Sequence, residues 1–392
     1  MTVSGLPAGQ HTVRRHNQQL VLSALLEATG SRADLAARTR LTKATVSSLV
    51  DELLAAGVLH EGPPASSGPG RPSRPLTFSP FGPVAIGLEI NVDYIAACVL
   101  DLSGRTVRHA RAEVDNRDRS PASLLQDAAS MTRRITDGLG RGVLGLALAV
   151  PGAVSPAGRV MRAPNLPRLA EIELADQADG ALGRWAGSGV LIENEANVAA
   201  LAWLRDRPRD EDFAYVSGEI GVGAGLVVGG GLFRGVNGFA GELGHVVVEA
   251  DGPACGCGGQ GCVEQYAGQD VLLASAGVGD VDGLSVAWAC GEPRARAAVE
   301  RAGSALGVGL ASLLNAVDVP LVVLGGLYAR LFDEIHPSLR AELHRRALSA
   351  PHHGGRLLRS GLGSEAAVLG AAGMVVEQAL ADPGRLSESV GS

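Results

Sequence analysis

In the first part of the chain, apolar side chains recur every three or four positions, a spacing typical of amphipathic helices. The pattern predicts a helix over residues 15–28, a short helix over 31–38 and a longer helix over 42–57, with a tight turn before the third. Ser31 is expected to cap the short helix, because an aspartate follows it at capping-box spacing. Thr42 is expected to cap the longer one.

Two short strands, over 58–61 and 74–78, are predicted next, with a loop rich in Pro, Ser and Gly between them. Helices joined by a tight turn and followed by such a hairpin are typical of a winged helix-turn-helix. An ordinary three-helix bundle with one polar face is the alternative. If the motif is a winged helix-turn-helix, the third helix and the wing would bind double-stranded operator DNA through Thr42, Lys43, Thr45, Ser47, Ser48, Arg71 and Arg74.

The charge distribution fits a DNA-binding head. Residues 1–75 contain eight Lys or Arg side chains and five Asp or Glu side chains, an excess of three positive charges. The whole chain has a net charge of −7, so the remainder carries an excess of ten negative charges. A small basic module attached to an acidic body indicates that only the basic module binds a polyanion. The excess is modest and does not decide the function by itself.

After Pro80 the pattern changes to short apolar runs separated by turn residues. In the first half it predicts strands over 84–90, 95–100 and 106–112, a helix over 121–139 and a strand over 143–150. In the second half it predicts strands over 213–217, 224–228 and 232–234, helices between 285 and 316, and a strand over 321–324. Two such halves resemble the two-lobed actin-like (ribonuclease-H-like) fold, an α/β fold that binds ligands between its lobes.

This pattern predicts three domains. They are a winged helix-turn-helix over 1–80, a first lobe over 81–198 with the C-terminal helix 363–392 packed back near the hinge, and a second lobe over 199–362.

The composition, with 46% hydrophobic and 19% charged residues, indicates a globular protein. No apolar run reaches the ~18 residues needed to cross a membrane, and the polar N-terminus lacks a signal-peptide core. We expect a cytoplasmic protein, since the cysteine pattern also suggests a reducing compartment.

Three cysteines lie close together in the second half, at C-x-C-x₄-C spacing. With a histidine ten positions upstream they supply three thiolates and one imidazole, the ligand set of a closed tetrahedral zinc site. Buried or reactive cysteines that happen to cluster are the alternative. The sequence therefore predicts a structural Zn²⁺ bound by His245, Cys255, Cys257 and Cys262.

Two glutamates flank this segment: Glu242 precedes the histidine by three positions, and Glu264 follows the last cysteine by two. The second nitrogen of a zinc-bound imidazole needs a hydrogen-bond partner. Two acceptors and one donor beside a rigid metal site suit a polyhydroxy compound, whose hydroxyls both donate and accept. Alternatively, both glutamates only orient His245 or face solvent.

These motifs together resemble the signature of the ROK family, which contains repressors, open reading frames and sugar kinases. The resemblance rests on G-E-L-G-H at 241–245, C-x-C-G-x-x-G-C-x-E at 255–264, and E-N-E-A-N at 193–197, which is similar to the family's E-N-D-A-N. Glycine-rich turns at 218–225 and 323–326 are similar to its phosphate loops. The resemblance implies sugar contacts at Gly158, Arg159, Asn165, Asn194, Glu195, Glu242, His245 and Glu264.

Three departures from the family's kinases argue against phosphoryl transfer. The proton-accepting aspartate is replaced by Glu195, and ~1 Å of misplacement can cost about a hundredfold in rate. The first phosphate loop, D-x-G-G-T in kinases, reads E-I-N-V-D at 89–93 and has lost both glycines. Glu219 would face nucleotide phosphates, and like charges ~4 Å apart cost on the order of 4 kcal/mol in a partly dry cleft.

The sequence therefore favours a sugar-responsive repressor that binds a sugar without phosphorylating it and works as a homo-oligomer, either a dimer or a tetramer. No catalytic residue is assigned. An active ATP-dependent sugar kinase with an accessory DNA-binding head is one alternative. A repressor released by a protein partner is the other.

Overall fold

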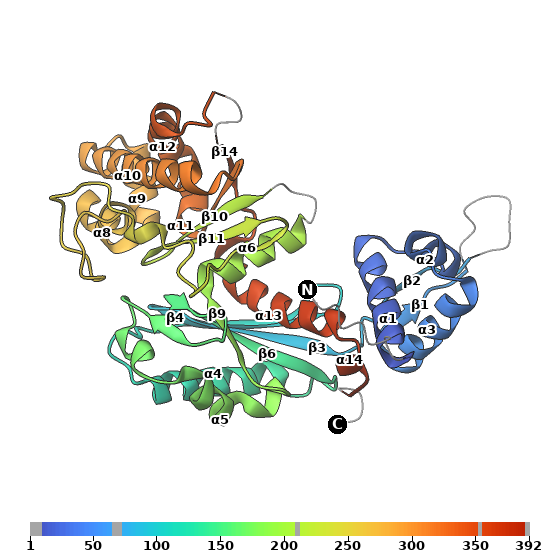
Figure 1. The fold of residues 1–392 in the computed structure, drawn as a ribbon. Coiled ribbons are helices and arrows are strands. Elements are labelled where there is room, and N and C mark those ends of the chain that lie inside the picture. Colours follow the sequence, from blue (N-terminus) through green and yellow to red (C-terminus); the bar gives the residue numbers. More distant parts are fainter. Residues whose placement is uncertain (1–9, 65–72, 208–211, 352–354, 389–392) are drawn as a thin grey trace, which may run out of the picture.

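The computed structural model describes residues 10–64, 73–207, 212–351 and 355–388 of the chain. Its N-terminal part lies to one side of a larger two-sheet body (Figure 1). This head contains α1 (Gln10–Glu27), α2 (Arg32–Thr39), α3 (Lys43–Ala55) and the antiparallel strands β1 (Leu59–Glu61) and β2 (Leu76–Phe78).

Both predicted helix caps of the head are present. The Ser31 side chain accepts from the Asp34 amide while Asp34 accepts from the Ser31 amide, a complete capping box. The Thr42 hydroxyl accepts from the Thr45 amide at 3.1 Å. Helix α1 begins at Gln10, earlier than residue 15, because Arg14 bonds Ser48 and Glu52 of α3 and so holds a turn that has no apolar stripe.

One five-stranded sheet has the order β5-β4-β3-β6-β9. Its strands are β3 (Val84–Ile90), β4 (Tyr94–Asp101), β5 (Thr106–Glu113), β6 (Val143–Val150) and β9 (Leu191–Asn194). Helices α4 (Pro121–Thr136) and α5 (Leu174–Ala186) pack on one face, and α13 (Ala366–Ala381) packs on the other. The hairpin β7 (Ala153–Val154) and β8 (Val160–Arg162) and the 3-10 turn η1 (Pro167–Glu171) lie between β6 and α5 in sequence. We call this sheet and its helices lobe 1.

The second five-stranded sheet has the order β12-β11-β10-β13-β14 and forms lobe 2. Its strands are β10 (Phe213–Gly218), β11 (Val222–Val228), β12 (Gly231–Leu232), β13 (Leu321–Gly325) and β14 (Arg356–Arg359). On one face pack α7 (Glu264–Ala267), α8 (Gln269–Ala276), α9 (Val281–Ala289), α10 (Pro293–Val317), α11 (Gly326–Arg330) and α12 (Phe332–Arg346).

Helix α10 is long and apolar enough to cross a membrane by length and composition alone, and the bent pair α8 and α9 passes the same test. However, 61% of the apolar window of α10 is buried inside the protein. It packs against Leu339 and Leu343 of α12 and against the apolar face of the second sheet. The apolar character of α10 is therefore that of a core helix.

Helix α6 (Glu195–Asp206) covers the other face of the second sheet and also packs on α13, so these two helices lie where the lobes meet (Figure 1). Helix α6 packs without a gap against both β11 and α13. A Cβ added at Gly225 of β11 would meet the Ala196 carbonyl, and one at Gly370 of α13 would meet the Val198 carbonyl. Two elements close the chain: the 3-10 turn η3 (Gly363–Glu365) before α13, and α14 (Gly384–Glu388) after it.

The head packs onto the same region. Val21 and Leu22 of α1 share one apolar cluster with Val375, Val376 and Leu380 of α13. At its edge Arg15 pairs with Asp382 at 3.4 Å. The head therefore rests on the helix that lies between the two lobes.

Candidate effector pocket and metal site

Four side chains with metal-binding atoms converge in lobe 2, and their ligand atoms all lie within 4.8 Å of one another: His245, Cys255, Cys257 and Cys262. The chain makes this possible through tight turns. The Cys255 amide donates to the Gly259 carbonyl at 2.9 Å, and Gly258 donates back to Cys255 at 2.9 Å. Gly261 adopts φ +61°, and a Cβ there would meet the Glu249 carbonyl.

The distances within this cluster suit a tetrahedral ion. The sulfurs of Cys257 and Cys262 lie 3.8 Å apart, and the Cys255 sulfur lies 3.7 Å from Nδ1 of His245. Metal–sulfur bonds of about 2.3 Å in a tetrahedron place two sulfurs about 3.8 Å apart. In addition, the Gly259 amide hydrogen-bonds to Cys257 and holds the pKa of that thiol below its usual range. The four residues thus form a site able to bind a metal ion.

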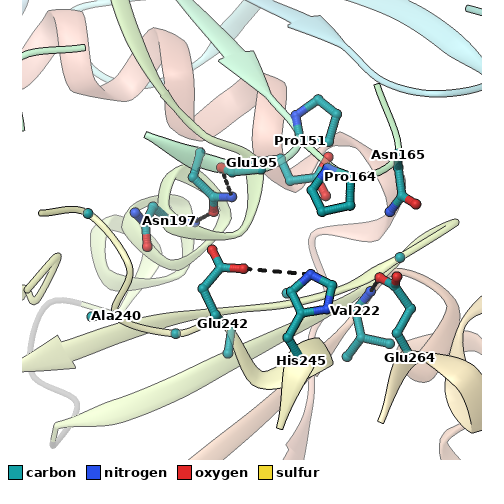
Figure 2. Close-up of a pocket in the computed structure, with 17 residues that line it drawn as sticks. Pro151, Pro164, Asn165, Glu195, Asn197, Val222, Ala240, Glu242, His245 and Glu264 are labelled. Carbon is teal, nitrogen blue, oxygen red and sulfur yellow. Dashed lines mark hydrogen bonds and ion pairs between the residues drawn. The ribbon is translucent and has the colours of Figure 1, made fainter. Parts of the chain in front are cut away.

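The imidazole connects this cluster to a pocket between the lobes. With Nδ1 toward the thiols, Nε2 lies 3.9 Å from a carboxylate oxygen of Glu242 (Figure 2). Six of the predicted sugar-contacting residues line this pocket together: Asn165, Asn194, Glu195, Glu242, His245 and Glu264.

Several of these side chains are held in place by the backbone. Glu264 accepts from the Val222 amide at 3.1 Å through one of its carboxylate oxygens. Asn194 caps α6 by accepting from the Asn197 amide at 3.0 Å and donates to the Gly152 carbonyl at 2.8 Å. Burial and the neighbouring Glu264 raise the pKa of Glu242 to about 7.

Two predicted contacts are not brought to the pocket. Gly158 and Arg159 lie in the turn of the β7–β8 hairpin, and Arg159 pairs with Glu173 at 3.0 Å. Conversely, the pocket is also lined by Asn197, which the sequence did not indicate as a contact. A signal existed, because Asn194 is the N-cap of α6 and Asn197 lies three positions later, in the first turn that this cap begins.

A group of carboxylates lies deeper in the interlobe cleft. Glu195 accepts from the Asn91 amide group at 3.0 Å, and the same group donates to Glu89 at 3.1 Å. Glu89 is only 1% exposed and also accepts from Tyr94 at 2.5 Å, but its Oε2 has no partner among the described residues. Burial and the charge of Glu89 raise the pKa of Glu195 well above its usual range.

Beyond these carboxylates is a second cavity, with a volume of about 620 Å³. The turn residue Glu219 faces it, and burial together with Glu89 and Asp93 raises the pKa of Glu219 to about 8. Its charged lining residues are four acids and two bases: Asp93, Glu219, Asp280, Asp282, Arg111 and Arg330. Both bases are already engaged, because Arg330 pairs with Asp282 at 2.5 Å and Arg111 pairs with Glu113 at 2.6 Å.

The predicted DNA-contacting residues lie around the start of α3. Thr42, Lys43 and Ser48 are exposed, and Thr45 and Ser47 are half-buried. Ser47 accepts from Arg32 at 2.9 Å and Ser48 from Arg14 at 3.2 Å, so two helices place arginines beside this face. On the hairpin, Arg74 pairs with Glu61 at 3.7 Å. The predicted wing contact Arg71 lies outside the described residues.

The two-sheet body, the G-E-L-G-H segment and the His–Cys cluster define a class of protein: the chain belongs to the ROK family, whose model matches residues 85–378. Along almost its full length it is similar to the xylose repressor of Bacillus subtilis (strain 168), with 30% identity over 95% of this chain and 98% of the relative.

Two solved structures resemble the chain. A ROK family transcriptional regulator, described as a homolog of the E. coli MLC protein, has a TM-score of 0.75 and 24% identity over 97% of this chain and 100% of its own; this likeness concerns the fold. A ROK family glucokinase from Streptomyces griseus, in complex with glucose and AMPPNP, has a TM-score of 0.64 and 28% identity over 74% of this chain and 98% of its own.

Proposed function

We propose that this protein is a sugar-responsive transcriptional repressor whose ROK body binds a sugar without phosphorylating it. The observation that carries the proposal is the contrast within the cleft. A pocket rich in hydrogen-bonding groups lies beside a buried group of carboxylates where a nucleotide would need positive charge. The similarity to the Bacillus subtilis xylose repressor supports it, because the alignment extends through the N-terminal head.

The lining of the pocket indicates the class of ligand. It contains three carboxylates, three side-chain amides and one imidazole, and none of the described lining residues is Lys or Arg. Such a set binds hydroxyls that both donate and accept, and it repels a phosphorylated or acidic sugar. A neutral sugar, with xylose as the first candidate, is therefore the proposed effector.

Zinc is the proposed occupant of the His–Cys cluster, held by His245, Cys255, Cys257 and Cys262. A bound ion would fix the imidazole through Nδ1 and keep Nε2 directed toward Glu242 and the pocket. It would also add a further cross-link to a loop that is held by tight turns and by the bridge between Val247 and Cys262. The role of the metal here is structural.

A sugar kinase is the second candidate, and one observation favours it: a carboxylate, Glu195, lines the sugar pocket at the kinase base position. The carboxylates in the cleft argue against a kinase. Glu195 is bonded to Asn91, and Glu89, Asp93 and Glu219 lie where phosphates would need donors. A coupled ADP-release assay over a panel of sugars distinguishes the two, because sustained turnover would establish the kinase.

For the head we propose a winged helix-turn-helix over residues 1–80 in which α3 enters the major groove of operator DNA. Thr42, Lys43, Thr45, Ser47 and Ser48 would then contact bases and phosphates, and Arg71 and Arg74 would reach from the wing. The proposed body has one lobe over 81–198, joined by the C-terminal helix 363–392, and a second over 199–362. The proposed form is a cytoplasmic dimer or tetramer, since operators are commonly bound by symmetric pairs of heads.

The test is a thermal-shift panel of neutral sugars, followed by gel shifts on the promoter of the protein's own gene with and without the sugar that binds. A ligand at a hundred times its Kd stabilises the folded protein by about 2.7 kcal/mol. Sugar binding that alters DNA binding supports the proposal. DNA binding with no response to any sugar supports release by a protein partner instead, and absence of specific DNA binding refutes a repressor.

A further inference from the structure

One loop of lobe 2 reaches across to lobe 1 beside the effector pocket. It runs from the end of β12 to Glu242, and Gly238 within it lies so close to lobe 1 that a Cβ there would meet the Val154 carbonyl. Its last part lines the pocket through Ala240 and Gly241. The position of this loop therefore sets one wall of the pocket.

An ion pair fastens the same loop to lobe 1. Arg234 Nε donates to Glu193 Oε2 at 2.5 Å, and the side chains are 32% and 5% exposed. The other oxygen of Glu193 accepts from the Asn194 amide at 2.9 Å and from the Asn197 side chain at 3.0 Å. Asn194 and Asn197 line the pocket. The carboxylate of Glu193 therefore positions these two pocket residues and, through Arg234, the loop of lobe 2 that forms another wall.

The pair also faces the helix on which the head rests. Arg234 and Glu193 line a cavity of about 550 Å³ together with Met374, Glu377 and Gln378 of α13. Neighbouring positions on α13 pack against the apolar side chains of α1. A movement of Arg234 away from Glu193 would therefore change both the pocket and the surroundings of α13.

We propose that Arg234 and Glu193 form a latch that holds the two lobes closed around the sugar and passes closure on to the head through α13. Both are positioning residues. The inference rests on the proposed function and names how the same pocket is regulated. A charge-assisted hydrogen bond at a nearly buried carboxylate is strong enough to favour one arrangement of the lobes. If the latch is broken, the closed form is less populated and the apparent affinity for sugar falls by that fraction.

The test uses the full-length, zinc-loaded protein with Arg234→Met, Arg234→Lys and Glu193→Gln. The matched control is Arg117→Met, which removes another interlobe pair, Arg117 with Asp270 at 3.0 Å, whose side chains are 41% and 58% exposed. Calorimetric titration with xylose, or with the panel sugar that binds the wild type, is expected to show at least about tenfold weaker binding for Arg234→Met. Arg234→Lys restores part of the loss, and Arg117→Met stays within about twofold.

Hydrogen exchange on the sugar-free protein gives an independent readout. The amides of residues 231–242 are expected to exchange faster in Arg234→Met than in the wild type, at unchanged zinc content. In a double-mutant cycle, Arg234→Met with Glu193→Gln should be no worse than the poorer single variant. Wild-type sugar affinity in Arg234→Met, additive losses, or unchanged exchange of the loop would overturn the latch. A wild type that binds no sugar refutes the proposed function, while exchange of the loop still decides the latch.

Discussion

Replacing Glu219 by glutamine tests how strongly the cleft disfavours a negative charge. Glu219 lies in the turn between β10 and β11, where its carboxylate faces the backbone of Gly326. Burial is the main reason that its pKa rises from 4.5 to about 8; Glu89 and Asp93 add to it, and Arg111 and Arg330 oppose it. The substitution keeps the shape of the side chain and removes its titration.

The expected effect depends on pH in a defined way. Between pH 4.5 and about 8 the folded protein keeps this carboxyl protonated, whereas the unfolded chain ionises it. Folding stability is therefore lost as the pH rises through this window, at about 1.4 kcal/mol per pH unit. The loss reaches on the order of 5 kcal/mol at pH 8 and then stays constant. Glu219→Gln should match the wild type near pH 4.5 and exceed it increasingly up to pH 8.

Urea unfolding at several values between pH 4.5 and 9 measures the difference. Glu300→Gln, at an exposed position of α10, changes the net charge by the same amount and serves as the control. The control is expected to show no comparable dependence on pH. If the difference between Glu219→Gln and the wild type is the same at pH 5 and pH 8, Glu219 titrates alike in the folded and unfolded protein, and the reasoning that burial, Glu89 and Asp93 disfavour its charge is wrong.

Three further predictions concern the metal, the head and the helix between the lobes. Chelation of the metal, or Cys257→Ser, should lower the melting temperature and abolish sugar binding, as measured by thermal shift and metal analysis; retained sugar affinity without metal would contradict the role given to His245. Thr42→Ala should cost about 1 kcal/mol of head stability and weaken operator binding in gel shifts, whereas Thr42→Ser should retain both. Gly225→Ala should destabilise the protein by about 1–3 kcal/mol in urea unfolding, because the Ala196 carbonyl lies where the new methyl group would go; an unchanged midpoint would mean that α6 has room to move.

The sequence predicted best the elements that have an unambiguous local signal. The strands over 84–90 and 143–150 agree with the structure to the residue, because each is a nearly continuous apolar run buried on both faces. Helix caps at Ser31 and Thr42 were equally clear. The strand Leu191–Asn194 was missed as an element, because it is only four residues long and half-buried at both ends.

The candidate site was predictable where spacing along the chain decides proximity. The His–Cys cluster is such a case, since its cysteines lie within eight residues of one another. Gly158 and Arg159 were placed by resemblance, and their hairpin turn lies elsewhere. Arg234 gave no signal, because its partner Glu193 is 41 positions away and only the folded lobes bring them together.

Helix α6 is the element through which sugar binding would act on the rest of the protein. Its first turn supplies Glu195 and Asn197 to the pocket, and its side chains form the core of one face of lobe 2. Gly225 and Gly370 let it touch β11 and α13 without a gap, so α6 packs closely on one element of each lobe. Relative movement of the lobes would therefore change at least one of these two contacts, and the Arg234–Glu193 pair joins the same two lobes. Since α1 of the head packs on α13, we expect a change at the α6–α13 contact to alter the position of the head as well.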